Sequence, residues 1–220
     1  MNLDYLGDAL DHWKGSLFAF LQGEGVLRDL VVDPMATDAL EWTAGDFALY
    51  ARLLRVSDDQ IIRHAFPLAV RSGYFAELRH RGDLFLDPDT GIDTGGGSPI
   101  AKYLKPIDIA SLLDGAMARV LAVYQHVRAR KTCDRVDACL ASVTREVPDV
   151  TWCSYESGTV AMLFLSRDPN RVQSIRLALE RLLGRHAERR VRVEPSVAGR
   201  PNNEMHLTSA RWSTTARARR

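Results

Sequence analysis

The chain has 220 residues, 46% of them apolar and 26% charged, which is the composition of a globular protein with one substantial core. Its formal net charge is +1, but residues 200–220 hold five arginines against one glutamate, so the first 199 residues carry a net charge of −3. That charge argues against non-specific nucleic-acid binding through a basic face.

Cysteine usage and hydropathy exclude two further classes of protein. The three cysteines contain no CxxC pair, which argues against a disulfide scaffold and against a zinc site of the usual spacing. No apolar run approaches the roughly 18 residues of a membrane helix, and the first residues do not have the pattern of a secretory signal. We therefore expect a cytoplasmic protein that does not associate with a membrane.

The N-terminal third predicts a helix, a short strand and two further helices. Apolar residues recur at helical spacing over 8–21, while Asp8 and His12 lie one turn apart on another face. Residues 27–33 are rich in β-branched residues and end before Pro34, as a strand would. Two capping boxes follow, Thr43 with Asp46 and Ser57 with Gln60, and each predicts the start of a helix.

The middle of the chain alternates between strands and helices. Residues 83–87 and 119–125 read as strands buried on both faces. A helix that opens at Pro106 separates them, and another helix follows around 136–147.

The C-terminal pattern is different. Residues 151–156 and 160–166 are strand-like and are joined by a short turn, which predicts an antiparallel hairpin. A last helix begins after Asp168 and ends near Gly184. Together the elements predict one α/β domain over 1–197, a three-layer Rossmann-like fold with a mostly parallel sheet and a C-terminal antiparallel hairpin. We expect residues 198–220 to form a disordered tail.

Polar residues end all three strands of the predicted parallel sheet. These ends are Asp33, then Asp87 with Asp89, and then Gln125 with His126. Ligands of open parallel sheets bind beyond the carboxyl ends of the strands, so these residues should face one crevice.

Each candidate residue has a second interpretation. Asp87 and Asp89 could hold Mg²⁺ or accept hydrogen bonds from an amine, but Asp-Pro-Asp is also common turn chemistry. His126 is either a general base or a structural histidine. The segment from Asp33 to Asp38 is a loop or a site, and the residues Asp8 and His12 are a local pair or a surface patch.

Residues 87–91, Asp-Pro-Asp-Thr-Gly, carry a resemblance. A strand that ends in such a motif, followed by a helix, a strand and a closing hairpin, resembles the C-terminal half of class I S-adenosylmethionine-dependent methyltransferases. The resemblance implies S-adenosylmethionine as cofactor, near Asp33 and Asp38, and Asp87 as the residue that accepts from the substrate amine. Members of that class have a glycine-rich loop after the first strand, whereas residues 33–38, at the corresponding place in this sequence, contain no glycine.

Two other segments resemble known sequences. Residues 5–14 are similar to the N-terminal helix of adenine-N6 ribosomal RNA methyltransferases, which implies that Asp8, His12 and Lys14 lie near the cofactor. Taken with Asp-Pro-Asp-x-Gly and Tyr-Gln-His, this helix also resembles a group of bacterial proteins of unassigned function. Residues 200–208 resemble peptides translated through the recombination site of an integron cassette, which implies a mobile bacterial gene.

Three functions follow from these patterns. The first is methyl transfer to an amine of a small molecule or a nucleic acid. The second is a metal-dependent hydrolase or nuclease, with Asp33, Asp87 and Asp89 around Mg²⁺ and His126 as general base. The third is a non-catalytic binding module that keeps the Rossmann-like frame without chemistry.

Overall fold

The computed structural model describes residues 1–36, 41–64, 71–79, 82–95, 103–115, 118–127 and 131–195. The fold is mixed α/β, as expected, and its main sheet has six strands in the order β1-β2-β5-β7-β6-β8. The strands of this sheet are β1 (Val31–Asp33), β2 (Leu84–Leu86), β5 (Leu121–His126), β6 (Thr151–Ser157), β7 (Val160–Ser166) and β8 (Val191–Val193).

The sheet is parallel in one half and antiparallel in the other. β1 pairs with β2 and β2 pairs with β5, both in parallel, which confirms that these three strands end at the same edge. β7 lies antiparallel to both β5 and β6, and β8 pairs antiparallel with β6. A separate pair of short parallel strands, β3 (Gly91–Ile92) and β4 (Tyr103–Leu104), follows β2 in the chain.

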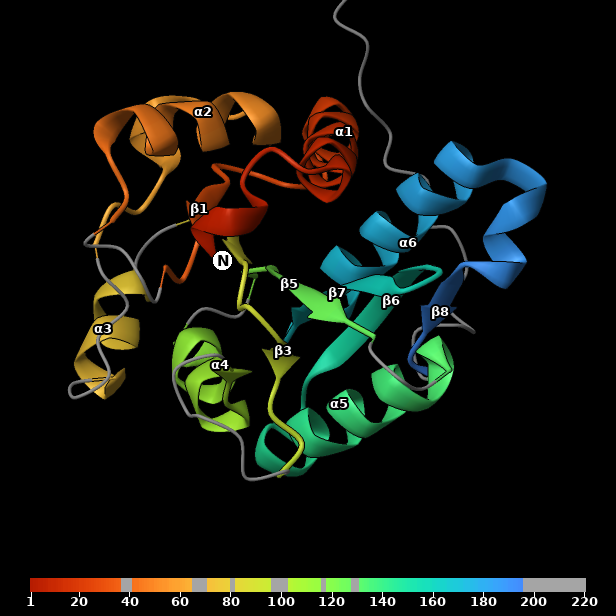
Figure 1. The fold of residues 1–220 in the computed structure, drawn as a ribbon. Coiled ribbons are helices and arrows are strands. Elements are labelled where there is room, and N and C mark those ends of the chain that lie inside the picture. The colour runs from red at the N-terminus through yellow and green to blue at the C-terminus, as the bar shows by residue number, and fades with distance from the viewer. Residues whose placement is uncertain are drawn as a thin grey trace, which may run out of the picture.

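Helices cover both faces of the sheet (Figure 1). One core cluster joins one face to α1 (Ala9–Gly23), α2 (Ala44–Leu54) and α6 (Pro169–Leu183). A second cluster joins the other face to α3 (Arg71–Leu78), α4 (Pro106–Leu113) and α5 (Thr132–Glu146). Alternate residues of the strands enter the two clusters, as the two-residue period of a strand requires.

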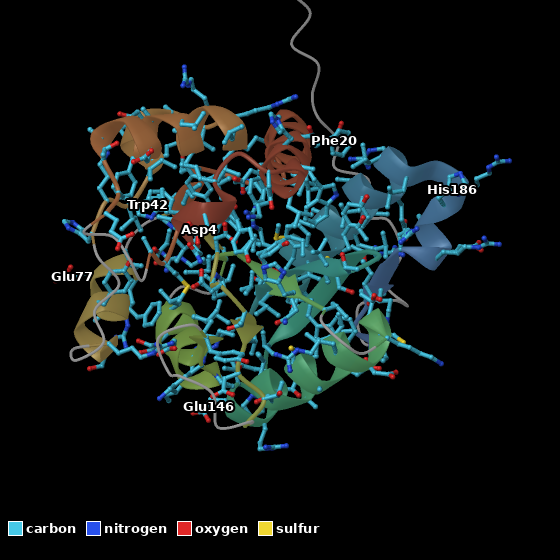
Figure 2. The ribbon with its side chains drawn as sticks, viewed as in Figure 1. Asp4, Phe20, Trp42, Glu77, Glu146 and His186 are labelled. Atoms are coloured by element: carbon cyan, nitrogen blue, oxygen red, sulfur yellow. The ribbon has the colours of Figure 1, made fainter. Side chains whose placement is uncertain are left out.

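The side chains in Figure 2 follow this division, since they fill the space between the sheet and its two groups of helices. The labelled side chains of Glu77, Glu146 and His186 lie at the periphery and are exposed. Among the described residues, no helix combines the length and the apolar character that crossing a bilayer requires.

A glycine brings the first two helices close together. A Cβ atom at Gly15 would lie 1.9 Å from the carbonyl oxygen of Leu53, so any other residue would push α1 away from α2. The capping box of Thr43 and Asp46 that opens α2 is present as expected. This contact places the neighbouring Lys14 and the buried Tyr50 on facing helices.

The predicted elements differ from the structure in several places. The box of Ser57 and Gln60 opens a 3-10 turn, Asp58–Gln60, instead of a long helix, because Ile61 then pairs with Val32 beside the sheet. The first strand covers only Val31–Asp33 of the expected 27–33. The helix α3 and the strands β3, β4 and β8 were not predicted. The tail expected over 198–220 lies outside the described residues.

Candidate functional site

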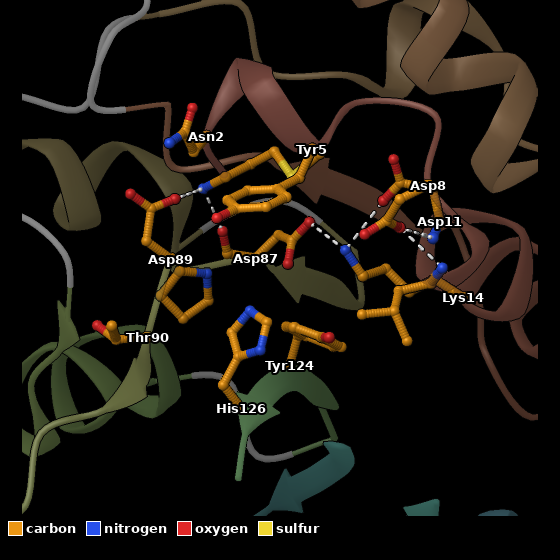
Figure 3. Close-up of a pocket in the computed structure, with 13 residues that line it drawn as sticks. Asn2, Tyr5, Asp8, Asp11, Lys14, Asp87, Asp89, Thr90, Tyr124 and His126 are labelled. Carbon is orange, nitrogen blue, oxygen red and sulfur yellow. Dashed lines mark hydrogen bonds and ion pairs between the residues drawn. The ribbon is translucent and has the colours of Figure 1, made fainter. Parts of the chain in front are cut away.

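A pocket of about 250 Å³ lies at the carboxyl edge of the parallel strands. Its walls come from the N-terminal segment, the start of α1, the loop after β2 and the end of β5 (Figure 3). Among the described residues that line it, four are aspartates and one is a lysine: Asp8, Asp11, Asp87, Asp89 and Lys14. Together with the amino group of Met1, which also lines the pocket, these groups give it a formal charge of −2.

Lys14 is the centre of a buried polar network on one side of the pocket. Its Nζ donates to Oδ2 of Asp87 at 2.7 Å and to Oδ1 of Asp11 at 3.1 Å. It also lies 4.3 Å from the ring centroid of Tyr124, a cation–π contact. The hydroxyl of Tyr50 donates to the same Oδ2 of Asp87 at 2.5 Å. The Asp87 carboxylate is thus bound from inside the protein by α1 and α2.

The pKa values of this network follow from burial and from its opposite charges. Burial would raise the pKa of Asp87, but Lys14, the amino group of Met1 and the Tyr50 hydroxyl outweigh it, and the pKa lies below its ordinary value. Burial would lower the pKa of Lys14, yet the two carboxylates hold that pKa above its ordinary value. Lys14 and Asp87 therefore form a charged pair.

The amino group of Met1 lies on the opposite side of Asp87. It donates to the carbonyl oxygens of Pro34 and Asp87, both at 2.7 Å, and forms an ion pair with Oδ1 of Asp89 at 2.9 Å. Figure 3 shows Asn2, Asp87 and Asp89 on this side of the pocket. Acceptors from the ends of β1 and β2 thus converge on one ammonium position.

Gln125 holds the loop that carries Asp89. Its Oε1 accepts from the backbone N–H of Ile92 at 2.8 Å, and its Nε2 donates to the carbonyl of Thr90 at 3.2 Å. Gly91 lies directly against Gln125 and has a φ of +96°. A Cβ atom at this position would lie only 2.3 Å from Oε1 of Gln125, which leaves no room for a side chain. The Asp-Pro-Asp-Thr-Gly motif therefore needs its glycine for packing against β5.

Asp33 is fully buried behind the pocket. Its Oδ1 accepts from the backbone N–H of Met35 at 2.8 Å, and its backbone carbonyl accepts from the N–H of Asp87 at 3.0 Å. Burial raises the pKa of Asp33 to about 6, against the lowering effects of the Met35 N–H, the Tyr74 hydroxyl and the Met1 amino group. Asp33 thus lies beneath the pocket, with a pKa of about 6.

The structure brings most of the predicted site residues together. Asp8, Lys14, Asp87, Asp89 and His126 all line the pocket. The carboxylate of Asp8 caps α1 by accepting from the backbone N–H groups of residues 10 and 11, so it has a structural task as well.

The other three predicted residues do not line the pocket. Asp33 lies buried behind it, whereas His12 is exposed on α1. Asp38 lies outside the described residues.

The sequence patterns missed several residues of the site. Tyr124 shares a strand face with His126, and the two rings meet edge to face at 4.7 Å, so the two-residue period was an available signal. Asp11 lies three residues before Lys14, a spacing at which helical side chains meet. For Tyr50 and the amino group of Met1 we see no signal, because their positions depend on how distant segments pack.

The described residues contain no group of three or more His, Cys, Asp or Glu side chains arranged to hold a metal ion. In comparisons with known proteins, no family model, no curated protein and no solved structure matches the chain.

Proposed function

We propose that the chain is a non-catalytic binding module with a Rossmann-like frame, and that its pocket binds a small molecule that carries an ammonium group. The observation that supports this proposal most directly is the charge of the pocket. Four aspartates line it, against one lysine and the amino group of Met1, so a cationic ligand gains favourable electrostatic energy there. The same charge repels a phosphodiester, which favours a small molecule over a nucleic acid.

The location and the aromatic walls support the same proposal. The pocket lies beyond the carboxyl ends of β1, β2 and β5, where open parallel sheets bind their ligands. Tyr5, Tyr124 and His126 line it, and aromatic faces attract ammonium groups. Helices on both faces of the parallel strands are the arrangement expected of the three-layer Rossmann-like frame.

The residues after β1 do not fit S-adenosylmethionine in the way the resemblance implies. That segment has no glycine to let the backbone approach a cofactor closely, and Met35 and Ala36 are residues of the hydrophobic core at 1% exposure each. A pocket of about 250 Å³ is also at the small end for a ligand of that size. We therefore derive no methyl-transfer step and favour the binding module among the three functions.

The role that the resemblance implies for Asp87 changes accordingly. Lys14 and Tyr50 already donate to its Oδ2, so the carboxylate of Asp87 balances Lys14, and its backbone carbonyl accepts from the amino group of Met1. We assign the charge contact with the ligand to Asp89, so an ammonium ligand would replace the amino group of Met1, the present partner of Asp89 at 2.9 Å. Binding of Mg²⁺ by Asp87 would have to displace Lys14 from a contact of 2.7 Å.

Calorimetric titration of the chain with n-butylamine, with sodium butyrate and with S-adenosylmethionine tests the proposal. We expect butylamine to bind and butyrate to give no heat, with Asp89→Asn weakening the amine at least about tenfold. Asp149→Asn, a change at an exposed carboxylate far from the pocket lining, serves as the matched control. Equal heats from the amine and the carboxylate would end the proposal, and tight binding of S-adenosylmethionine would restore methyl transfer as the favoured function.

A further inference from the structure

A second cavity, of about 680 Å³, lies between α3 and α4, which are side by side in Figure 1. At one end Arg71, the first residue of α3, donates to the carboxylate of Asp108 in the first turn of α4. At the other end Arg79, directly after α3, donates to Ser111 and forms an ion pair with Asp114, directly after α4. The two helices therefore run in the same direction, and we call the space between them the α3–α4 groove.

The charge of the α3–α4 groove is opposite to that of the pocket beside Asp87 and Asp89. Four cationic side chains line it against two carboxylates, which gives a formal charge of +2: Arg71, Arg79, Lys105, Arg167, Asp108 and Asp114. An anion therefore gains favourable electrostatic energy in this groove.

The end of the groove near Arg79 holds donors that the protein does not use. The Nη2 of Arg79 donates to the hydroxyl of Ser111 at 3.0 Å, but Nη1 lies 3.5 Å from Oδ2 of Asp114, and Nε is buried without a hydrogen-bond partner. The Nε of Arg167 lies 3.3 Å from Oδ2 of Asp149 and also makes no hydrogen bond. Guanidinium groups with unused donors bind oxyanions, so the ligand that fits this end carries a negatively charged oxygen.

Arg167 belongs to the same end of the groove as Arg79. Leu165 of β7 pairs with Leu121, the first residue of β5, so β7 ends where β5 begins. Arg119, just before β5, donates to backbone carbonyls in the last turns of both α3 and α4. The ends of these two helices and the end of β7 therefore meet at one edge of the sheet.

An apolar surface leads along the groove away from Arg79. Ile107 lines the groove and is 56% exposed, although it is a large apolar side chain. Ala110 and Phe75 also line the groove, and Ile107 and Ala110 share a face of α4 because they are three residues apart. Seven residues separate Ile107 from Asp114, a rise of about 10 Å along the helix, which an extended chain of about eight carbons spans.

From these contacts we propose that the α3–α4 groove binds a carboxylate with an unbranched apolar chain, as in a medium-chain fatty acid. The carboxylate accepts from Arg79, and the chain lies along α4 as far as Ile107. A carboxylate has two coplanar oxygens, which match two neighbouring N–H groups of one guanidinium. A phosphate would bring a second negative charge to the end that already holds Asp114, so a singly charged head group is favoured. This site is separate from the pocket of the proposed function and does not depend on it.

Calorimetric titration of the full chain with sodium octanoate, octanamide, sodium butyrate and octyl phosphate tests the ligand class. We expect octanoate to bind and octanamide, which has the same length without the charge, to bind at least about tenfold more weakly. Butyrate lacks four methylene groups and should also bind at least about tenfold more weakly. Octyl phosphate should bind less tightly than octanoate. Absence of octanoate binding, equal binding of octanamide, or tighter binding of octyl phosphate would each overturn the inference.

Two variants show whether octanoate binds in the α3–α4 groove. Arg79→Gln and Ile107→Ser should each weaken octanoate at least about fivefold. Arg145→Gln, at an exposed position of α5, and Leu182→Ser, at a 43% exposed position of α6, are the matched controls and should leave the affinity unchanged. Ile107 is exposed, so its variant should fold even if Arg79→Gln does not. Octanoate affinity that Ile107→Ser leaves unchanged would place the ligand elsewhere.

A third variant separates this site from the pocket. Asp89→Asn should weaken n-butylamine and leave octanoate unchanged, and saturating butylamine should not alter the affinity for octanoate. If octanoate fails to bind while butylamine binds, the groove is wrong and the proposed function stands. If Asp89→Asn weakens octanoate as much as Ile107→Ser does, the groove is not the site of the carboxylate.

Discussion

Replacing Asp33 with asparagine should stabilise the protein at neutral pH. Asp33 is fully buried, and burial raises its pKa to about 6 from the ordinary value of 3.8. Between these two values the native state holds more protons at this site than the unfolded state does. Stability therefore falls as the pH rises from about 4 to about 6, and the loss is complete above pH 6.

The size of the effect follows from the shift in pKa. A difference of about two units corresponds to about 3 kcal/mol of unfolding free energy at pH 7.5, and to less than about 1 kcal/mol at pH 4. Asparagine keeps an oxygen for the 2.8 Å hydrogen bond from the Met35 N–H and carries no charge. Asp33→Asn should accordingly gain up to about 3 kcal/mol at pH 7.5 and little at pH 4.

Urea unfolding of both proteins from pH 4 to pH 8 measures this difference directly. The informative quantity is the gap between the two stability curves, since every other titrating group is common to both proteins. Asp59→Asn, at an exposed position of the 3-10 turn, is the control and should run parallel to the parent chain. If the gap stays constant across the pH range, or widens toward pH 4, then the pKa of Asp33 is not raised by burial in the native state.

Two further changes test the packing of the site. Lys14→Met leaves the buried carboxylate of Asp87 without its counter-charge and should lower the free energy of unfolding in urea by about 3–5 kcal/mol. Adding Asp87→Asn should recover part of that loss. If the losses of the two single variants simply add in the double variant, the two residues do not form a pair. Gly91→Ala should cost more than Gly158→Ala, which we expect near 1 kcal/mol, because both glycines have positive φ but only Gly91 lies against Gln125. Equal losses of thermal stability in the two alanine variants would show that Gln125 does not press on the loop.

Much of the strand edge could be predicted from the sequence because its signals are local. The run Leu84–Leu86 is apolar and bounded by aspartates, and the structure buries it on both faces between two parallel neighbours. The cap residue Asp168 also behaves as its position before a proline predicts, by accepting from the N–H of Asn170. Because parallel strands share an edge, Asp87 and His126 then had to be neighbours.

The interior of the site could not be predicted, because it depends on contacts between distant segments. Lys14 and Asp87 are 73 residues apart, and their pairing requires that Gly15 bring α1 against α2. The capping box of Ser57 and Gln60 is present in the structure, but a tertiary contact overrides the helix that it predicts. Ile61 forms a β-bridge with Val32, so the chain leaves the helical path after one 3-10 turn. Asp87 illustrates this limit most clearly. Its sequence motif indicated a ligand contact, but in the structure its carboxylate already accepts from Lys14 and Tyr50.

Strand β5 both lines the pocket and holds the loop of residues 90–92, and it does so with side chains on opposite faces. Tyr124 and His126 point to the pocket, while Gln125 between them points to the other face and ties down the loop of residues 90–92. Substitutions at 124 and 126 can therefore reshape ligand preference without loosening the loop that presents Asp89. Libraries that randomise position 126, keep an aromatic residue at the buried position 124 and keep Gln125 should yield altered selectivity in proteins that still fold.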